Sequence, residues 1–438
     1  MKITFMGAGS SVFAKNVLGD VLMTPALCED LTIALYDIDG VRLEESYLMI
    51  DLINKKYNEG KARVEKYLGI PQRRDALRGA KFVINAIQVG LYDPSTIIDF
   101  EIPKKYGLRQ TIGDTLGIGG IMRGMRTIHV LKGFAEDMEA VCPDAWFLNY
   151  TNPMAILTGY MLRYTKIKTV GLCHSVQVCT SSLFEDLGMD HGRIGSELIA
   201  GINHMGWLID VRDKEGRDLY PEIRQKAKEK NRESHKNMVR LDYIDKFGYY
   251  CTESSEHNAE YNPFYIKSKY PELIERFNIP LDEYPRRCRV QIERWENQRD
   301  EIMAGGNIEH ERSCEYASRI MEAIVTDTPY KIGGNVLNTG LIDNLPSDAC
   351  VEVPCLVDGG GIHPTHVGRL PVQCAAMNMT NINPQLLTIE AAVTGKREHL
   401  YQAAMLDPHT AAELSIDDII SMCDELIEAH TKAGYPVF

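Results

Sequence analysis

Two short segments carry side chains that could together hold a metal ion. Cys173 and His174 stand side by side in GLCHS, and His204 stands in GINHMGW. A thiolate and a neutral imidazole are good ligands for divalent transition metals, and two protein ligands leave coordination positions open for substrate oxygens. The spacing alone is a weak signal, because a buried cysteine and a histidine bonded to backbone would look the same.

The positions of these residues strengthen the metal hypothesis. Cys173 closes a strand-like run at residues 169–172, and His204 closes another at residues 198–203. Both side chains are therefore expected to face one crevice. His174 is expected either to bind substrate hydroxyls or to cap the helix that follows.

A glycine-rich turn near the N-terminus points to a second ligand. In MKITFMGAGSSVF, Gly7 and Gly9 permit a tight turn that brings the backbone and the following helix N-terminus close to a pyrophosphate. The third glycine of the usual pattern is replaced by Val12, which is expected to hold the helix farther from its strand. Asp37 ends the next strand, where an acid can accept hydrogen bonds from an adenosine ribose, so NAD is preferred to NADP.

The elements expected around these residues define the first half of the fold. Strand patterns at residues 2–7, 31–36, 81–87, 145–148 and 169–172 alternate with helical patterns such as 41–57, 120–140 and 153–164. This alternation predicts an α/β fold in which helices cover a parallel sheet. Ligands bind beyond the carboxyl ends of such strands, where Asn85, Asn149 and Cys173 stand.

The alternation breaks down after about residue 200. We expect a hairpin between residues 208–211 and 217–220, a strand near 350–357, and C-terminal helices at 388–405 and 416–433. The chain is therefore expected to form a Rossmann-type NAD-binding domain over residues 1–195. A mixed α+β domain over residues 196–438 is expected to serve substrate, metal and oligomerisation.

Composition limits the partners that the chain can bind. The 438 residues include 48 Lys and Arg against 61 Asp and Glu, a formal net charge of -13. This charge disfavours binding to nucleic acid or to anionic membranes and favours a small neutral partner. The 11 cysteines are odd in number and irregularly spaced, which is typical of reduced thiols, and residues 3–6 are too short for a signal-peptide core. A cytoplasmic protein is expected.

Several motifs in order resemble one enzyme family. GAGSSVF, LYDID, INAIQVG, TIGDTLGIGG, FLNYTNPMA, GLCHSVQ, GINHMGW, ESSEHNAEY and NLPSDACVEVP cover essentially the whole chain. They are similar to the family 4 glycoside hydrolases, specifically to the bacterial α-galactosidase branch. This NAD-dependent family differs from glycosidases that use two carboxylates.

The resemblance implies a fold similar to lactate and malate dehydrogenases, one tightly held NAD, and a divalent metal, typically manganese, at Cys173 and His204. In the implied reaction NAD oxidises sugar C3, a base removes the C2 proton, the C1 group leaves by elimination, water adds, and C3 is reduced again. By affinity alone a Cys/His site favours zinc over manganese. The manganese expectation therefore rests on the resemblance.

The resemblance also implies roles for polar residues at the strand ends. Asn149 and Asn152 match positions that contact substrate hydroxyls and the nicotinamide, although Asn152 also suits a turn before Pro153. Arg109 is expected either to clamp substrate or to bridge surface acids. The residues expected to line the cofactor are Gly7, Gly9, Ser10, Ser11, Asp37, Asn85, Gln88 and Asn149.

Acid and base assignments stay open at this point. Asp114, in TIGDTLG, is expected either to protonate the departing oxygen or to cap a helix. His174 is a further catalytic candidate. In related phosphoglycosidases a tyrosine removes the C2 proton, and the candidates here are Tyr249, Tyr250 and Tyr261, with His257 and Glu260 as competitors.

The resemblance also limits the class of sugar that is expected as substrate. Phosphate-specific relatives usually carry Cys-Asn or Cys-Asp where this chain has Cys173 and His174, so a free α-galactoside such as melibiose or raffinose is expected. An α-glucosidase or α-galacturonidase of the same family is an alternative. A further alternative is an NAD-dependent hydroxy-acid or sugar dehydrogenase, which needs no cysteine ligand. Relatives with this fold are usually homodimers or homotetramers.

Overall fold

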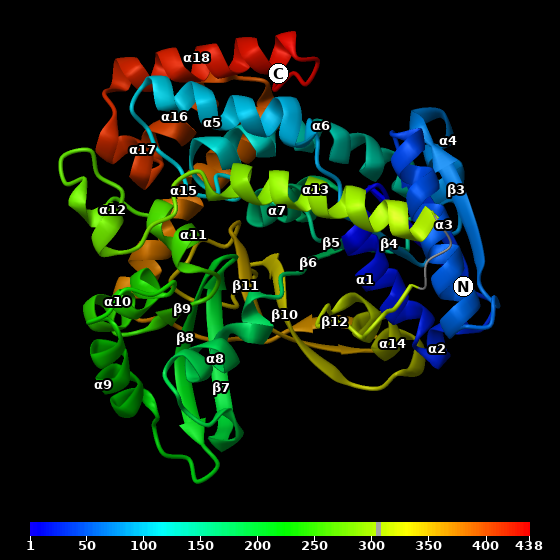
Figure 1. The fold of residues 1–438 in the computed structure, drawn as a ribbon, viewed down its shortest axis with the longest axis horizontal. Helices are drawn as coiled ribbons and strands as arrows, with labels where there is room; N and C mark the ends of the chain where they lie inside the picture. Colours follow the sequence, from blue (N-terminus) through cyan, green and yellow to red (C-terminus); the bar gives the residue numbers. More distant parts are fainter. Residues whose placement is uncertain (304–307) are drawn as a thin grey trace.

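The chain folds around a single mixed β-sheet. The computed structural model describes residues 1–303 and 308–438, and in this described part twelve strands join in one sheet (Figure 1). Eleven of them follow the order β3-β2-β1-β4-β5-β6-β10-β11-β7-β8-β9, and β12 pairs with β11. The strands are β1 (Lys2–Met6), β2 (Thr32–Asp37), β3 (Arg63–Leu68), β4 (Phe82–Asn85), β5 (Trp146–Asn149), β6 (Lys168–Gly171), β7 (Ile194–Ile202), β8 (Met205–Asp213), β9 (Tyr250–Cys251), β10 (Tyr330–Leu337), β11 (Cys350–Asp358) and β12 (Gly361–Pro364).

Helices follow most strands of the first half and dominate the second half. In the first half they are α1 (Ser11–Leu22), α2 (Pro25–Cys28), α3 (Gly40–Tyr57), α4 (Gly69–Leu77), η1 (Leu91–Thr96), α5 (Ile97–Lys105), α6 (Gly117–Val141), α7 (Met154–Tyr164), α8 (Ser175–Asp186) and η2 (His191–Arg193). In the second half they are α9 (Tyr220–Lys230), α10 (Met238–Phe247), α11 (Ser255–Glu260), α12 (Glu272–Arg276), α13 (Glu283–Met303), α14 (Ala317–Thr326), α15 (Val372–Thr394), α16 (Arg397–Leu406), α17 (Pro408–Glu413) and α18 (Ile416–Lys432).

The first six strands confirm the expected Rossmann-type sheet. All of their pairings are parallel, and their order, β3-β2-β1-β4-β5-β6, is the one that binds dinucleotides at the carboxyl ends of the strands. The short apolar runs that predicted β1, β2, β4, β5 and β6 are buried on both faces, as a covered parallel sheet requires. Strand β3, which the sequence did not predict, lies at the edge of the sheet and is partly exposed. The fold class is therefore α/β, with a mixed α+β part after it.

The second half corrects two expectations. Strand β7 pairs antiparallel with β8 through a turn at residues 203–204, whereas the expected partner, residues 217–220, makes only an isolated bridge between Arg212 and Asp218. The error arose because the charged residues 213–216 look like a hairpin turn. The expected helix at 388–405 is instead the end of α15 and the start of α16, because Gly395 takes a left-handed φ of 69° and ends α15.

The two halves of the chain share one β-sheet and one hydrophobic core. Strand β10 pairs with β6, so the strands of the second half continue the same sheet beyond β6. One hydrophobic cluster includes Ile3 and Leu148 of the first half and Trp207 and Val353 of the second. The division at residues 195 and 196 therefore stays a prediction.

The C-terminal helices lie along α5 and α6 (Figure 1). A fully buried charged group joins them: Asp99 of α5 accepts from Arg126 of α6 at 2.7 Å and contacts His430 of α18 at 2.8 Å. Within the described part of the chain, no helix has the length and apolar character needed to span a membrane.

Candidate functional site

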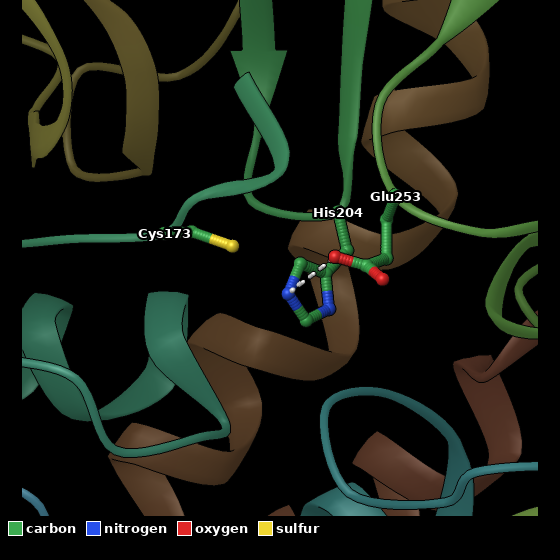
Figure 2. Close-up of side chains that lie close together, drawn as sticks. All are labelled: Cys173, His204 and Glu253. Carbon is green, nitrogen blue, oxygen red and sulfur yellow. Dashed lines mark ion pairs between the residues drawn. The ribbon is translucent and has the colours of Figure 1, made fainter. Parts of the chain in front are cut away.

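Three side chains from distant segments converge on one point. One ligand atom each from Cys173, His204 and Glu253 lies within 4.8 Å of the others (Figure 2). Cys173 follows β6, His204 occupies the turn between β7 and β8, and Glu253 follows β9. Because β9 pairs with β8, the sheet itself brings Glu253 beside the turn that carries His204. Thiolate, imidazole and carboxylate are together a donor set that suits a divalent transition metal.

Two of these residues hold a backbone conformation that is uncommon for side chains of their size. His204 has a φ of 62° and Glu253 a φ of 63°, both in the left-handed region. Such conformations cost free energy and persist where the surrounding structure enforces them, and they are enriched at functional sites. Here the strained residues are the ones whose side chains meet.

Burial and neighbouring charges determine the protonation of the three groups. Burial lowers the pKa of His204 to about 4, so its imidazole is neutral at pH 7. Burial alone would raise the pKa of Glu253, but the electrostatic attraction of nearby basic groups, chiefly His257, outweighs burial and lowers that pKa to about 2. Burial and the charge of Glu253 raise the pKa of Cys173 well above its ordinary value. A divalent cation would provide the positive charge that the thiolate and carboxylate require.

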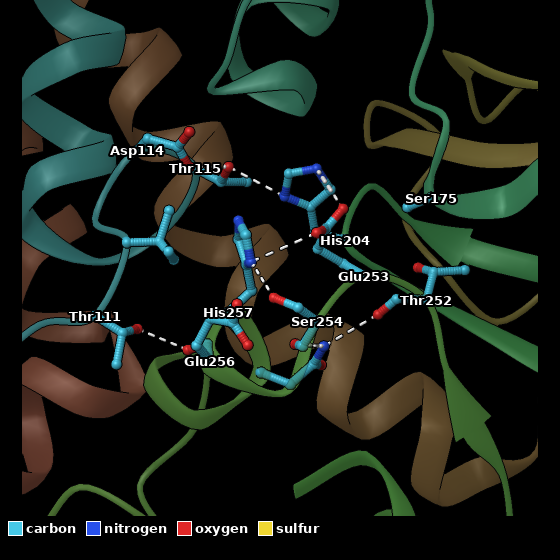
Figure 3. Close-up of polar contacts among 12 residues, drawn as sticks. Thr111, Asp114, Thr115, Ser175, His204, Thr252, Glu253, Ser254, Glu256 and His257 are labelled. Atoms are coloured by element: carbon cyan, nitrogen blue, oxygen red, sulfur yellow. Dashed lines mark hydrogen bonds and ion pairs between the residues drawn. The ribbon is translucent and has the colours of Figure 1, made fainter. Parts of the chain in front are cut away.

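The hydrogen bonds of Thr115 determine which nitrogen of His204 is free. Thr115 donates its one hydroxyl proton to Asp114 Oδ1 at 2.7 Å, and its oxygen lies 3.1 Å from His204 Nδ1 (Figure 3). With Asp114 ionised, the oxygen then accepts from Nδ1, which places the ring proton on Nδ1. Nε2, which points toward Glu253 Oε2 at 3.5 Å, keeps its lone pair for a metal.

Further polar residues surround this group (Figure 3). His257 packs edge-on against His204, and its Nδ1 lies 2.6 Å from Ser254 Oγ. The Tyr261 hydroxyl lies 3.3 Å from His204 Nδ1, and burial raises the pKa of this phenol well above 10. Asn152 Nδ2 lies 3.5 Å from Asp114 Oδ2, while Asn152 Oδ1 has no hydrogen-bond partner among the described residues.

The N-terminal turn has the geometry of a dinucleotide site. Gly7 has a φ of 86°, and a Cβ there would lie 2.8 Å from the Ala86 carbonyl oxygen, so this position requires glycine. The Gly9 amide donates to Asp37 Oδ2 at 2.6 Å, which places the acid against the turn. Val12 is half exposed, and its expected effect on the distance between the helix and its strand stays a prediction.

Four residues proposed for the site are not directed toward it. Tyr250 is fully buried and accepts from Asn237 at 2.9 Å, and Tyr249 packs edge-on against Tyr220; both contact the hydrophobic cluster beneath α9 and α10. The Arg109 side chain is 47% exposed and faces Asp282. The Asn149 side-chain amide is hydrogen-bonded to Asn85, Thr151 and Thr158. The structure thus does not bring these four side chains to the converging group, and the roles predicted for them stay predictions.

The other predicted residues take varied positions. His174 is exposed at the N-terminal end of α8, and its side chain makes no capping hydrogen bond. Ser11 contacts Ser46 and the Gly9 carbonyl, and Ser10 is exposed at the turn. Asn85 donates to Asn149, while Gln88 is half-buried.

Sequence reasoning missed two residues of the site. Glu253 begins the motif ESSEHNAEY, and Thr115 follows Asp114 directly. An acid placed just after a short strand was a usable signal for Glu253. The role of Thr115 depends on its hydroxyl direction, which no sequence pattern specifies.

A cavity of about 500 Å³ lies elsewhere, between α8, α14 and strands β10 and β11. Of the described residues, those that line it include Gln177, Tyr316 and Glu352 but not Cys173, His204 or Glu253.

Comparison with known proteins supplies the family. The model for "Family 4 glycosyl hydrolase" matches residues 2–189, and that for its C-terminal domain matches residues 199–410. This chain belongs to the family 4 glycosyl hydrolases. An alpha-galactosidase of Bacillus subtilis is 64% identical over 429 residues, which is 98% of this chain and 98% of that protein.

Solved structures place this family 4 chain among known folds. A 6-phospho-beta glucosidase from Thermotoga maritima, solved with manganese, NAD+ and glucose-6-phosphate, has a TM-score of 0.78 at 21% identity and covers 99% of each chain. A malate dehydrogenase from Cryptosporidium parvum has a TM-score of 0.52 at 14% identity, over 90% of this chain and 99% of that one. These likenesses confirm the predicted dehydrogenase-like fold.

Proposed function

We propose that this protein hydrolyses α-galactosides of the melibiose or raffinose type and uses NAD and a divalent metal, typically manganese. The observation that carries the proposal is the convergence of Cys173, His204 and Glu253 beneath the loop of Asp114. The family membership and the name of the Bacillus subtilis relative support the same activity. His174 stands where phosphate-specific relatives carry Asn or Asp, and this difference favours an unphosphorylated sugar.

The residues present suit both bound groups. Cys173, His204 and Glu253 would hold the metal, and Gly7, Gly9 and Asp37 would hold the NAD. When bound, NAD supplies reversible oxidation at sugar C3, and the metal supplies positive charge for oxygens on C2 and C3. The protein supplies orientation and proton transfer.

Acid catalysis is assigned to Asp114. Its Oδ1 is held by Thr115 and its Oδ2 lies beside the Asn152 amide, so the carboxyl group is oriented from two sides. Protonated, it can donate to the departing C1 oxygen. The unpartnered Asn152 Oδ1 can accept from a sugar hydroxyl, and exposed His174 can contact another.

The C2 base is assigned to Tyr261, the tyrosine that lies in the cluster. Its hydroxyl contacts His204, and as a phenolate it could take the C2 proton, a form that a nearby cation favours. His257, which Ser254 and Glu253 orient through Nδ1, is the competing base.

An activity assay tests the proposal. The purified protein is supplied with NAD, manganese and a thiol reductant, and given nitrophenyl α-galactoside, with the β-galactoside, α-glucoside and α-galacturonide as controls. We expect cleavage of the α-galactoside without net accumulation of NADH. Absence of cleavage of all these glycosides contradicts the hydrolase assignment, and net NADH formation would favour a dehydrogenase.

We also propose that the enzyme is cytoplasmic and forms a homodimer or homotetramer. The irregular, odd set of 11 cysteines supports a reducing compartment. Light scattering coupled to size-exclusion chromatography measures the assembly directly. A monomer at micromolar concentration would contradict the oligomer.

A further inference from the structure

A buried carboxylate binds the loop that leads to Asp114. Glu260, at the end of α11, is 2% exposed. Its Oε2 accepts from the Thr111 amide at 2.7 Å, its Oε1 accepts from the Gly113 amide at 2.8 Å, and the Ile112 amide lies 3.2 Å from Oε2. Three consecutive backbone N–H groups thus point at one side chain, the arrangement by which loops bind anions.

The loop continues directly into the metal site. Two residues after Gly113, Thr115 contacts His204 Nδ1 and so fixes the imidazole with Nε2 free. The position of Thr115 therefore depends on a loop whose preceding amides are held by Glu260. The same helix end supplies Tyr261, which contacts His204 Nδ1 as well.

We propose that Glu260 is a positioning residue for the metal site, which acts through the backbone of residues 111–113 and through Thr115 to orient His204. This inference rests on the metal site of the proposed function. Groups that orient a metal-bound histidine typically change metal affinity by about 10–100-fold when they are removed.

The geometry excludes a different role for Glu260. Both carboxylate oxygens are occupied by backbone amides, so neither is directed at a substrate carbon. This contact pattern removes Glu260 from the competitors for the C2 base. Burial raises its pKa to about 7, so a test at pH 8 examines the ionised form.

Manganese binding by the Glu260→Gln variant tests the proposal. Gln keeps the shape but replaces one acceptor oxygen with a donor that faces N–H groups. We expect the manganese dissociation constant, read from the electron paramagnetic resonance signal of free Mn²⁺ at pH 8, to rise about 10–100-fold. We expect Thr115→Val to cause a similar loss of manganese affinity and Thr115→Ser to keep the parental affinity. In the double variant Glu260→Gln/Thr115→Val, the loss of binding free energy should be smaller than the sum of the two single losses.

Glu256→Gln is the matched control. Glu256 lies one helical turn earlier on α11, and its side chain pairs with Arg287 and not with the loop amides. We expect this variant to bind manganese and NAD like the parent protein. Parental affinity in Glu260→Gln, or an equal loss in Glu256→Gln, overturns the proposal.

The remaining outcomes are also decisive. If Glu260→Gln does not fold, the Thr115 variants test the proposal. Parental manganese affinity in Thr115→Val contradicts the orientation of His204 through Thr115. Lower manganese affinity in Thr115→Val together with parental affinity in Thr115→Ser supports it. A parent protein that binds no manganese contradicts the proposed function itself. If the parent protein binds manganese and Glu260→Gln binds it equally well, only the role of Glu260 is contradicted.

Discussion

Cys173 is the residue on which metal binding should depend most. It is the sulfur ligand of the converging group, and a serine hydroxyl is a far weaker ligand for a transition metal than a thiolate. We expect Cys173→Ser to lose metal-dependent glycosidase activity by at least about 100-fold. Cys179→Ser, a change at another buried cysteine about one turn into α8, should retain activity. Equal activity in both variants, assayed with saturating manganese, would argue against a sulfur ligand.

Glu352 should make stability dependent on pH. It is fully buried on β11, accepts from Asn335 at 2.9 Å, and burial raises its pKa from 4.5 to about 8. The folded protein therefore keeps a proton that the unfolded chain releases above pH 4.5, so stability is lost as pH rises toward 8. The effect is on the order of a few kcal/mol. Urea unfolding of the metal-free protein measures the free energy of unfolding at pH 5 and at pH 8.5. This free energy should fall more between the two pH values in the parent protein than in Glu352→Gln. An equal fall in both proteins would contradict the role of Glu352.

Individual residues were predictable where their chemistry was distinctive. Cys173 and His204 could be selected because each follows a strand and each is a good metal ligand, and the structure brings them together. Glu253 and Thr115 could not be selected with the same assurance, because acids and threonines have many structural uses. Tyr249 and Tyr250 were selected by adjacency to a motif, but the path of β9 directs them to another cluster.

Among the elements, α5, α6 and α18 are joined by a buried charge whose loss should be costly. Asp99 contacts Arg126 and His430, all three nearly inaccessible to solvent. Asp99→Asn would leave a buried guanidinium without its counter-charge, and we expect a loss of about 3–5 kcal/mol in the free energy of unfolding. Lys105→Gln, which removes an exposed ion pair with Glu425 between α5 and α18, should cost less than about 1 kcal/mol. Similar denaturation midpoints for the two variants would contradict this ranking.

The elements of the first half were predictable because local pattern and tertiary structure agree. A parallel sheet buried on both faces produces short apolar runs, and these runs identified β1, β2 and β4 to β6. Strand β3 escaped detection, because its side chains at the sheet edge are mostly polar and partly exposed. The partner of β8 was misassigned because pairing depends on contacts across the sheet, which sequence does not specify.

At the scale of the whole molecule, the two ligand sites should be separable by mutation. Asp37 contacts the glycine turn, whereas the metal ligands lie beyond β6, β7 and β9. Asp37→Ala should weaken NAD binding by roughly tenfold or more, since it removes the ribose acceptor, and should leave manganese binding unchanged. Cys173→Ser should do the reverse. Isothermal titration of each ligand on each variant measures this; joint loss of both ligands in either variant would contradict separate sites.

During catalysis, we expect a base beside the Cys173–His204–Glu253 group to remove the C2 proton of the sugar. Hydrolysis of an α-galactoside in deuterated water, with NAD and manganese present, tests it through mass and proton spectra of the released galactose. We predict deuterium at C2, because a proton that leaves for a base is replaced from solvent. Galactose that carries no deuterium at C2 after complete turnover would contradict elimination and, with it, the assigned roles of the site.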